Sequence, residues 1–452
     1  MSVVDPSIFK AYDIRGVVPE QLDEEIAYRI GRAFVRVVNP GRQGNQVVVG
    51  RDMRVSGPML FAAVARGIND EGVDVIDIGM SATDMYYYAC ATTGAPGMMI
   101  TASHNPKEYN GFKMVREMPY LLSGDEGIQE IRRLVEANRF GPAAAARGTV
   151  RTMDVREGFV TKVLSLIDVD RIEPLKVVID AGNGMGGVMA DAVYERLPVQ
   201  LVRLYFEPDG TFPNHGGDPL LPENRAELEK RVVAENAHCG FAFDGDADRF
   251  FSVNDRGAFV PGDFMTALLA REFLRDHPGA RVIYDLRASH AVPDTIRAAG
   301  GVPLMNRVGH AFIKKRMKDE DAVFAGEVTG HYYFRDFFCA DSGIIPSLKV
   351  MEMLSRHHCK LSDLLKPLEE HYFISGEINV PVAQAAEKLA RLEERYKDAQ
   401  LLHLDGLSVE YPDWHFNVRP SNTEPLLRLN LEAKDPELMA RKRDEVMEII
   451  RS

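Results

Sequence analysis

Three segments of the chain share one layout, and this repetition limits the possible folds more than any other feature. The segments are NQVVVGRDMRVSGP, LKVVIDAGNGMGGV and ARVIYDLRASHAVP, at residues 45–58, 175–188 and 280–293. Each opens with a short β-branched run, breaks at Asp or Gly, and continues into a stretch that can form a helix. Such units are typical of parallel α/β sheets. Because they begin about 100 to 130 residues apart, we expect three related α/β domains, although any α/β protein contains similar strands.

The last stretch of the chain has a different pattern. From about Phe373 the sequence predicts a strand, an amphipathic helix, a pair of strands joined by a loop, and a closing helix. Strands that alternate with helices over about 80 residues favour a small α+β domain. We therefore expect an α/β protein with three related α/β domains and a smaller C-terminal α+β domain, at residues 1–152, 153–255, 256–369 and 370–452.

Charge and cysteine usage exclude several classes of function. The formal net charge of −13 argues against nucleic acid or an acidic membrane surface as the main partner, because both require a basic face. The sequence shows neither a signal peptide nor a run of the ~20 apolar residues that a membrane span needs. Its four cysteines form no C-x-x-C pair, so neither a cysteine zinc site nor a disulfide framework is indicated. We expect a cytoplasmic protein with reduced thiols.

A serine follows a segment that the sequence predicts to be a buried strand. In GMMITASHNP, residues 97–106, an apolar run gives way to a polar loop with Ser103 and His104 at its centre. A serine hydroxyl is a weak nucleophile unless a base, a metal or its own phosphorylation changes its chemistry. The G-x-S-x-G pattern of serine hydrolases is missing here. A polar turn without catalytic function remains open.

An aspartate-rich loop follows a second apolar strand. In FAFDGDADRFF, residues 241–251, Asp244, Asp246 and Asp248 occupy alternate positions. Three carboxylates from one short loop suit a hard divalent cation such as Mg²⁺, and without a cation they would repel one another. An EF-hand is excluded because Arg249 stands where its loop requires Gly. A solvated acidic turn remains open, but the flanking Phe residues make simple exposure unfavourable.

A third loop combines a carboxylate, a hydroxyl and an imidazole. In AGEVTGHYYFRD, residues 325–336, Glu327, Thr329 and His331 alternate between two glycines. Alternate residues of an extended segment point to the same side, so these groups could bind sugar hydroxyls or transfer protons near neutral pH. An ordinary turn beside a tyrosine-rich strand explains the pattern equally well.

The fourth loop combines guanidinium groups with small polar side chains. In NVRPSNTEPLLRL, residues 417–429, these are Arg419, Ser421, Asn422, Thr423 and Arg428. Guanidinium binds a phosphate dianion through two parallel hydrogen bonds, and hydroxyl groups can complete its coordination. The loop therefore predicts a phosphate-binding site, with a surface turn as the alternative.

Taken together, the four loops resemble one family. TASHNP, DGDADR, GEVTGH and RPSNTEP occur in the order and approximate spacing of the α-D-phosphohexomutase superfamily. AYDIRG, GRDMRVSG, NGFK, FPNHGGDPLLPEN and RVGHAFIKK extend the resemblance over essentially the whole chain. The RPSNTEP loop is similar to that of the phosphomannomutase/phosphoglucomutase branch, because Asn422 stands where phosphoglucosamine mutases typically have Gly.

This resemblance implies a fold and a reaction. The fold would have four domains around a central active-site cleft. The enzyme would interconvert hexose 1-phosphate and hexose 6-phosphate, of mannose, glucose or both, through a phosphoserine and a hexose 1,6-bisphosphate that also serves as activator. Its partners would be small sugar phosphates, with neither nucleic acid nor membrane involved, and it would act as a monomer or a homodimer.

The resemblance also implies roles for individual residues. Ser103 would be the phosphoserine, and Mg²⁺ would be held by its phosphate together with the three aspartates. Glu327 and Thr329 would bind sugar hydroxyls, and the loop from Arg419 to Thr423 would bind the phosphate that does not react. The remaining residues expected in the cleft are Arg15, His104, Lys113, Arg249, Arg287, His310, His331 and Arg428. Arg287 stands where many members have Lys, and the general base is either His331 or Lys113.

Two other classes of function compete with the mutase. A phosphatase would hydrolyse the phosphoenzyme formed at Ser103, or would use Asp244 as an aspartyl nucleophile. FAFDGD does resemble the strand end of haloacid dehalogenases, but Asp248 stands where those enzymes have Thr. A sugar-phosphate-binding protein without catalysis would need a broken serine or metal loop, and both loops are intact.

Overall fold

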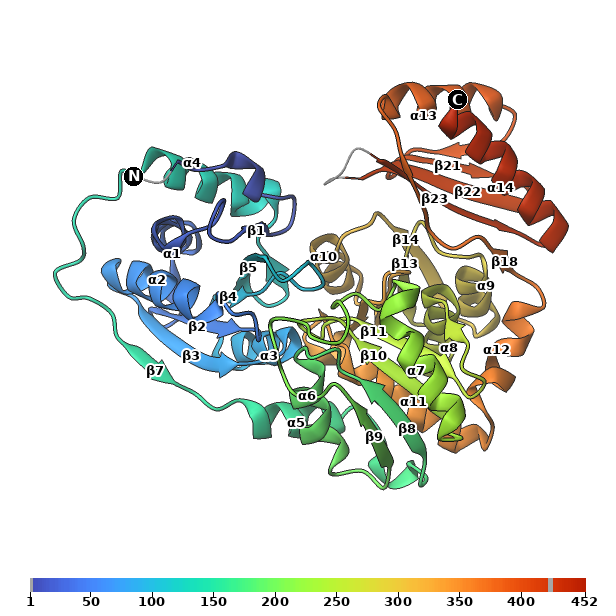
Figure 1. Ribbon diagram of the computed structural model, residues 1–452, viewed down its shortest axis with the longest axis horizontal. Coiled ribbons are helices and arrows are strands. Elements are labelled where there is room, and N and C mark those ends of the chain that lie inside the picture. The colour runs from blue at the N-terminus through green and yellow to red at the C-terminus, as the bar shows by residue number, and fades with distance from the viewer. Residues whose placement is uncertain (1–2, 422–425) are drawn as a thin grey trace. The chain divides into compact units, whose positions relative to one another are not determined.

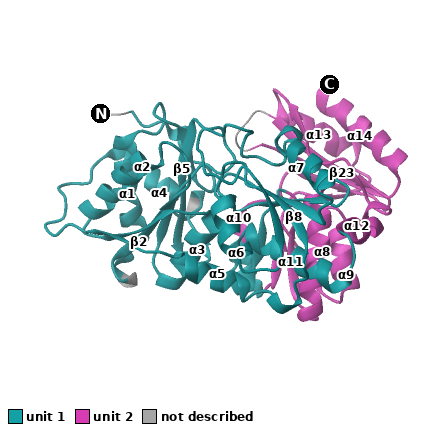
Figure 2. Cartoon of the chain, turned by 60° about the horizontal axis from the view of Figure 1, so that its bottom comes forward, with its two compact units in different colours: residues 1–259, 314–321, 329–360 teal, residues 260–313, 322–328, 361–452 magenta. Residues whose placement is uncertain are grey.

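Two compact units make up the chain (Figures 1 and 2). The computed structural model describes residues 3–421 and 426–452. Unit 1 contains residues 1–259, 314–321 and 329–360, and unit 2 contains residues 260–313, 322–328 and 361–452. Each unit therefore combines segments that are far apart in the sequence. Among the described residues, none of the helices is both long enough and apolar enough to span a membrane.

The first sheet of unit 1 contains β4 (Gly97–Ile100), the strand that leads into the predicted serine loop. Its strands follow the order β1 (Ile14–Val17), β5 (Tyr109–Glu117), β4, β2 (Gln46–Arg51), β3 (Asp74–Met80) and β7 (Val150–Thr152), and β6 (Tyr120–Leu121) pairs with β5. Strand β2 runs parallel to β3 and β4, whereas β5 is antiparallel to β4. The helices of this part are α1 (Glu24–Val38), α2 (Gly57–Asp70), α3 (Thr83–Thr93) and α4 (Gln129–Ala137).

Helices α1 and α2 pack very closely in this part of the chain. A Cβ atom at Gly31 would lie 2.5 Å from the carbonyl oxygen of Val64, and one at Gly67 would lie 2.3 Å from that of Tyr28. Only glycine allows backbones to approach this closely. The apolar core beneath the helices includes Val47 and Phe112, both fully buried.

The second sheet of unit 1 carries the aspartate loop. Its order is β12 (Phe259–Val260), β11 (Phe250–Asn254), β10 (Cys239–Phe243), β8 (Lys176–Asp180) and β9 (Gln200–Leu204). Strand β8 is parallel to β9 and β10, whereas β11 is antiparallel to β10. The helices of this part are α5 (Arg156–Leu164), α6 (Gly186–Tyr194), α7 (Pro222–Ala234) and α11 (Ile344–His357). Strands β16 (Tyr332–Phe334) and β17 (Ala340–Asp341) form an antiparallel pair in the same unit.

Unit 2 combines a parallel and an antiparallel arrangement. Strand β13 (Arg281–Asp285) is parallel to β14 (Val302–Asn306) and β15 (Phe324–Gly326), and helices α8 (Gly262–Asp276), α9 (Ala291–Ala298) and α12 (Leu361–Glu369) belong to this part. Helix α10 (His310–Glu320) begins in unit 2 and continues into a segment of unit 1.

The C-terminal part of unit 2 is built on an antiparallel sheet. Its order is β18 (Phe373–Ile374), β23 (Leu426–Ala433), β22 (Trp414–Pro420), β21 (Leu407–Glu410) and β20 (Gln400–Leu402), and β19 (Ile378–Pro381) pairs with β23. Helices α13 (Ala385–Arg395) and α14 (Pro436–Arg451) complete it. The core between sheet and helices includes Phe416, Leu429 and Ile450, all fully buried.

The repeated layout in the sequence is confirmed. Strands β2, β8 and β13 arise from the three repeated segments, and helices α2, α6 and α9 follow them. Each of these strands is parallel to both of its described neighbours. The strand pair and the two helices predicted for the C-terminal part are confirmed as β22 with β23, α13 and α14.

Candidate active site

The serine loop is a tight turn at the end of β4. All four residues of β4 are buried, and Ser103 follows with a φ of 50°, in the left-handed region that most residues avoid. The Ser103 N–H donates to the Thr101 hydroxyl at 2.9 Å, which helps to fix this conformation. Backbone strain of this kind persists only where neighbouring groups enforce it. The turn therefore holds the serine in one defined orientation.

A buried arginine clamps the same turn. The guanidinium of Arg54 donates to the carbonyl oxygens of Ser103 at 2.9 Å and Asn105 at 2.7 Å, and also to those of Pro106 and Tyr109. Arg15 donates to the side-chain oxygen of Asn105. Sequence reasoning placed Arg15 at the site but missed Arg54, although the GRDMRVSG motif contains it.

The serine hydroxyl lies against the aspartate loop. Its Oγ donates to Oδ2 of Asp244 at 2.6 Å and lies 3.2 Å from Nδ1 of His104. The backbones are equally close, because a Cβ atom at Gly245 would lie 2.4 Å from the Ser103 carbonyl oxygen. The two loops that the sequence separates by about 140 residues thus form one structure.

All three aspartates of the second loop are buried and converge. One carboxylate oxygen from each of Asp244, Asp246 and Asp248 lies within 4.8 Å of the others. The ammonium group of Lys113 donates to Asp246 at 2.7 Å and also to Asp248. The Thr83 hydroxyl donates to Asp246 at 2.6 Å, so the start of α3 supports the loop.

Burial and charge set the protonation of this cluster. Burial, reinforced by Asp246 and Asp248, raises the pKa of Asp244 to about 8. Burial alone would also raise the pKa of Asp248, but the charge of Lys113 holds it well below its usual value. Burial alone would lower the pKa of Lys113, yet the aspartate charges outweigh this effect and raise it. The lysine is therefore firmly held as an ammonium ion.

The donor set of the cluster fits a hard divalent cation. Oδ1 of Asp246 and Oδ1 of Asp248 are buried and lack a hydrogen-bond partner within residues 3–421 and 426–452. Buried carboxylate oxygens without donors are costly unless a cation meets them. Lys113 donates to the Oδ2 atoms of Asp246 and Asp248, so the Oδ1 atoms of these two carboxylates remain for a cation. Oxygen ligands of this kind suit Mg²⁺.

An arginine and a histidine lie beside the aspartates. The Arg249 N–H donates to Oδ1 of Asp244 at 3.1 Å, and its Nε donates to Nε2 of His331 at 3.3 Å. The same nitrogen of His331 lies 3.5 Å from Oδ1 of Asp248. Burial, followed by the positive charge of Arg249, lowers the pKa of His104 well below its usual value, so that imidazole is neutral. Unit 1 thus brings together every residue predicted for phosphoryl transfer.

A second group of predicted residues meets in unit 2. Arg287 is buried, and its guanidinium donates two hydrogen bonds to Asp285, at 3.0 and 2.9 Å. Its guanidinium lies 3.9 Å from Oε1 of Glu327, which accepts a hydrogen bond from the Gly309 N–H at 3.3 Å. His310, half-buried, begins α10 directly after that glycine. Arg287 and Glu327 are therefore neighbours, as the resemblance implies.

A carboxylate that sequence reasoning missed binds the arginines of the predicted phosphate site. Glu377 lies 2.9 Å from Arg428, 3.3 Å from Arg287 and 4.0 Å from Arg419. Burial alone would raise the pKa of Glu377, but the three guanidinium charges outweigh it and lower that pKa. The glutamate belongs to none of the motifs, so only the folded structure identifies it. Its carboxylate pairs with these guanidinium groups in the way that an anionic ligand would.

Some predicted site residues stay predictions. Asn422 and Thr423 lie outside the described residues. Ser421 is half-buried, and its N–H donates to the Leu426 carbonyl oxygen at 2.9 Å. Thr329 is half-buried in unit 1 whereas Glu327 belongs to unit 2, so the face that they were predicted to share is not tested.

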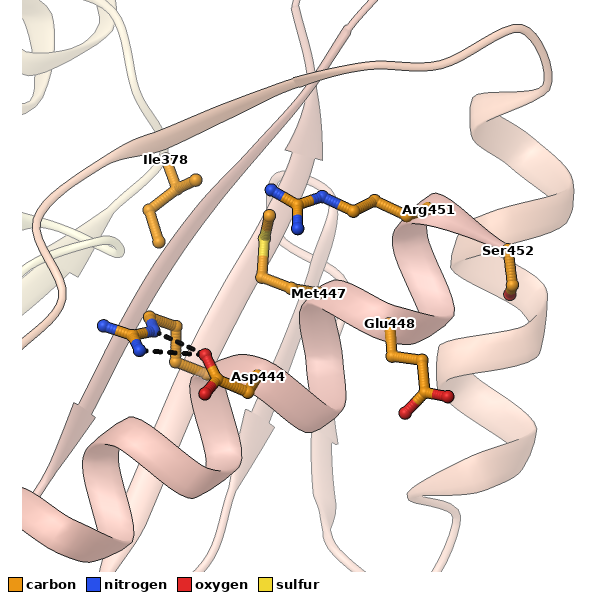
Figure 3. A pocket seen from close by; sticks show the side chains of 7 residues that line it. Ile378, Asp444, Met447, Glu448, Arg451 and Ser452 are labelled. Atoms are coloured by element: carbon orange, nitrogen blue, oxygen red, sulfur yellow. Dashed lines mark hydrogen bonds and ion pairs between the residues drawn. The ribbon is translucent and has the colours of Figure 1, made fainter.

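A separate cavity of about 640 Å³ lies beside α14 (Figure 3). Its lining includes Ile378, Met447 and Arg451, together with Asp444, which pairs with Arg443 at 2.9 Å. None of the predicted site residues within residues 3–421 and 426–452 lines this cavity. The two clusters described above, and not this cavity, carry the chemistry that the sequence predicts.

Models of one protein family match the chain in four consecutive regions. They are the phosphoglucomutase/phosphomannomutase α/β/α domains I, II and III and the C-terminal domain, at residues 6–142, 157–257, 261–372 and 377–449. The chain belongs to the phosphoglucomutase/phosphomannomutase family. The resemblance noted in the sequence and the four-domain α/β fold are thereby confirmed.

Relatives within this family cover almost the entire chain. A phosphomannomutase of Salmonella montevideo is 44% identical over 98% of this chain and 99% of its own. A protein of Xanthomonas campestris described as phosphohexose mutases is 41% identical over the same shares. A crystal structure of a phosphoglucomutase/phosphomannomutase family protein from Burkholderia thailandensis has a TM-score of 0.90 and 37% identity, and covers 99% of this chain and 98% of its own. The chain is a phosphohexomutase, an enzyme that interconverts 1- and 6-phosphates of hexoses.

Replacing Gly245 by Ala should separate the serine and aspartate loops. A methyl group 2.4 Å from the Ser103 carbonyl oxygen cannot be accommodated without backbone movement. Because displacement of reacting groups by about 1 Å can cost about 100-fold in rate, we expect kcat of the mutase to fall by about this factor. The matched control is Gly41→Ala, where the nearest heavy atom lies 3.9 Å from the added carbon. Equal kcat in the two variants would contradict the close contact.

Replacing Glu377 by Gln should destabilise the chain in a way that inorganic phosphate reverses. The variant leaves three guanidinium groups without their shared carboxylate, so we expect a loss of about 1–3 kcal/mol in the free energy of unfolding. Millimolar phosphate should restore more stability to this variant than to the wild type, as measured by thermal melting. Exposed Glu387→Gln is the control. A phosphate effect that is the same in E377Q and the wild type would show that Glu377 and phosphate do not share these arginines.

Proposed function

We propose that Ser103 carries the phosphoryl group that this phosphohexomutase transfers. The observation that carries the proposal is the 2.6 Å hydrogen bond between the buried Ser103 hydroxyl and Asp244, inside a cluster of three carboxylates. Phosphoserine donates its phosphoryl group to a free sugar hydroxyl, which gives the 1,6-bisphosphate, and the other phosphate then returns to Ser103. Only 2% of the serine is exposed, which protects a phosphoserine from hydrolysis.

Asp244, Asp246 and Asp248 are the residues that would hold Mg²⁺ beside Ser103. When bound, the ion supplies positive charge that neutralises the transferring phosphoryl group. Arg249 and Lys113 add fixed positive charge from the protein itself, since both contact these aspartates. Phosphoryl transfer depends mainly on position and charge neutralisation, which these side chains provide.

His331 is the better candidate for the general base. The aspartates raise the pKa of Lys113, so its ammonium group holds its proton and cannot accept another. The imidazole of His331 accepts a hydrogen bond from Arg249 at Nε2, which places the lone pair of a neutral ring, and not its proton, on that nitrogen. A neutral imidazole can accept the proton of the attacking sugar hydroxyl near neutral pH.

The residues of unit 2 would recognise the sugar phosphate. Glu327 would accept hydrogen bonds from sugar hydroxyls, and Arg287 beside it fixes the position of that carboxylate. Arg419 and Arg428 would bind the phosphate that does not react, in exchange for Glu377. Mannose and glucose differ at the 2-hydroxyl, and we assign none of these groups to that position, so we propose activity on both mannose and glucose phosphates.

Replacing Ser103 by Ala should abolish the phosphoenzyme and the isomerisation. Removal of a nucleophile that forms a covalent intermediate lowers kcat by more than about 1000-fold, while sugar-phosphate binding should remain measurable. The measurement is isomerisation of mannose 1-phosphate and glucose 1-phosphate with a trace of bisphosphate, together with peptide mapping of an acid-stable phosphate. Exposed Ser165→Ala is the control. An acid-labile phosphate on Asp244 with net release of inorganic phosphate would instead indicate a phosphatase.

Binding of Mg²⁺ should strengthen as the pH rises towards 8. With a pKa of about 8, the Asp244 carboxyl carries a proton below that pH, and a cation has to displace it. We expect the affinity for Mg²⁺ to rise by up to about tenfold per pH unit between pH 6 and 8 and then to level off, in calorimetric titrations of the full chain. Asp244→Asn should bind more weakly and lose this slope. An affinity that does not change with pH would contradict the assignment of Asp244 as a ligand.

A further inference from the structure

The motif FPNHGGDPLLPEN, residues 212–224, supplies none of the groups that bind phosphate, metal or sugar in the proposed site. It runs from the connection after β9 into the first turn of α7, within unit 1. Its His215 forms an ion pair with Asp180, the last residue of β8. The two side chains are 13% and 1% exposed, so the pair is largely shielded from water.

Both nitrogens of the His215 ring face oxygen atoms. Nε2 lies 3.1 Å from each carboxylate oxygen of Asp180, and Nδ1 lies 2.9 Å from the carbonyl oxygen of Gly216. A carbonyl oxygen and an ionised carboxylate accept hydrogen bonds and cannot donate them, so each ring nitrogen has to carry a proton. The geometry therefore fits the imidazolium form of His215.

Asp180 is the charged group that controls the protonation of this ring among the described residues. Burial alone would lower the pKa of His215, but the hydrogen bond and charge of Asp180 outweigh it and raise that pKa. The Tyr205 ring packs edge-on against the imidazole, with centroids 5.3 Å apart. Glu227 and Arg231 of α7 act electrostatically on Tyr205, but they pair with each other at 3.4 Å.

The segment before this ion pair lies against the arginine that clamps the serine turn. A Cβ atom at Gly210 would lie 2.6 Å from the carbonyl oxygen of Met53 and 2.7 Å from Cα of Arg54. The guanidinium of Arg54 also lies over the ring of Phe212, 5.6 Å from its centroid. A displacement of this segment would therefore disturb the clamp on the serine turn.

The segment continues onto the aspartate loop. A Cβ atom at Gly217 would lie 3.5 Å from Cα of Gly245, which is van der Waals contact. The Met185 N–H, in the loop after β8, donates to the Gly245 carbonyl oxygen at 2.9 Å. The ion pair between His215 and Asp180 thus joins two segments that both contact Gly245.

We propose that His215 is a positioning residue of the mutase, whose imidazolium ion holds residues 209–217 against the serine and aspartate loops. The inference rests on the proposed function of these loops, in which Ser103 and Asp244 keep their close contact during phosphoryl transfer. Loss of one ring proton places a nitrogen lone pair against an oxygen lone pair. The contact then becomes repulsive, and the segment no longer supports the two loops.

This role predicts that the reaction slows as the pH rises. Because Asp180 raises the pKa of His215, the imidazolium is complete below about pH 6.5 and is lost as the pH passes through the raised value. The value of kcat at saturating Mg²⁺, glucose 1-phosphate and bisphosphate should fall over the same pH range. The opposite trend, a stronger binding of Mg²⁺ towards pH 8, is removed by saturation with the ion.

The test compares kcat with the titration of the His215 ring in the full-length enzyme. kcat is measured from about pH 6 to 9, and the ring is followed by NMR of its Cε1–H. We expect both to change over one pH range in the wild type. In His215→Gln, kcat at pH 7 should be about 10- to 100-fold lower with KM nearly unchanged, and the alkaline fall should be absent. In Asp180→Asn, the fall and the ring titration should both move to lower pH.

The matched control is a histidine beside the opposite end of β8. His238 is exposed, and its Nδ1 accepts a hydrogen bond from the N–H of Lys176, the first residue of that strand, at 2.9 Å. His238→Gln should leave kcat and the alkaline fall unchanged. Melting temperatures establish that each variant is folded. If Asp180→Asn does not fold, the partly exposed His215 still provides the test.

Two results would overturn the role of His215. One is a kcat at pH 7 that is unchanged in His215→Gln, and the other is a wild-type alkaline fall that persists in that variant. Peptide mapping of the phosphoenzyme in the same samples tests the proposed carrier separately. Phosphate on Ser103 together with a persistent alkaline fall would refute the positioning role alone.

Discussion

The mutual repulsion of three buried aspartates is the constraint on which the rest of unit 1 depends. Carboxylates within 4.8 Å of one another, removed from water, cannot all remain charged without positive neighbours. Strand β10 ends at this loop, α3 brings Thr83 to it, β5 brings Lys113, and the turn after β4 brings the Ser103 hydroxyl. Several elements thus converge because each supplies a donor that one short acidic loop needs.

The sequence predicted the repeated elements and the clustering of the aspartates because both are encoded locally. Alternation after a β-branched run identified β2, β8 and β13, and the spacing of Asp244, Asp246 and Asp248 identified an oxygen-rich cluster. What remained hidden were partners supplied from distant segments. Arg54 acts through backbone carbonyl oxygens, and Glu377 acts through arginines 51 and 90 residues away. Neither role follows from a residue's immediate neighbours in the chain.

The proposal of His331 rather than Lys113 as the general base also depends on the fold. The sequence alone does not favour His331 or Lys113 as the general base, since each lies in a loop or strand near the predicted site. Folding gives Lys113 two carboxylate partners, which hold its proton, and places an arginine donor against Nε2 of His331. The identity of a proton acceptor is therefore a property of its surroundings more than of its type.

Glu377 gives the arginines of unit 2 a resident counter-ion. A mutase whose bisphosphate intermediate reorients has to release one phosphate of that molecule and then bind the other. In the proposed phosphate site, Glu377 would replace each departing phosphate, so that the guanidinium groups would always contact a negative group. This exchange would weaken the binding of any single sugar phosphate and would help the bisphosphate to reorient between its two phosphoryl transfers.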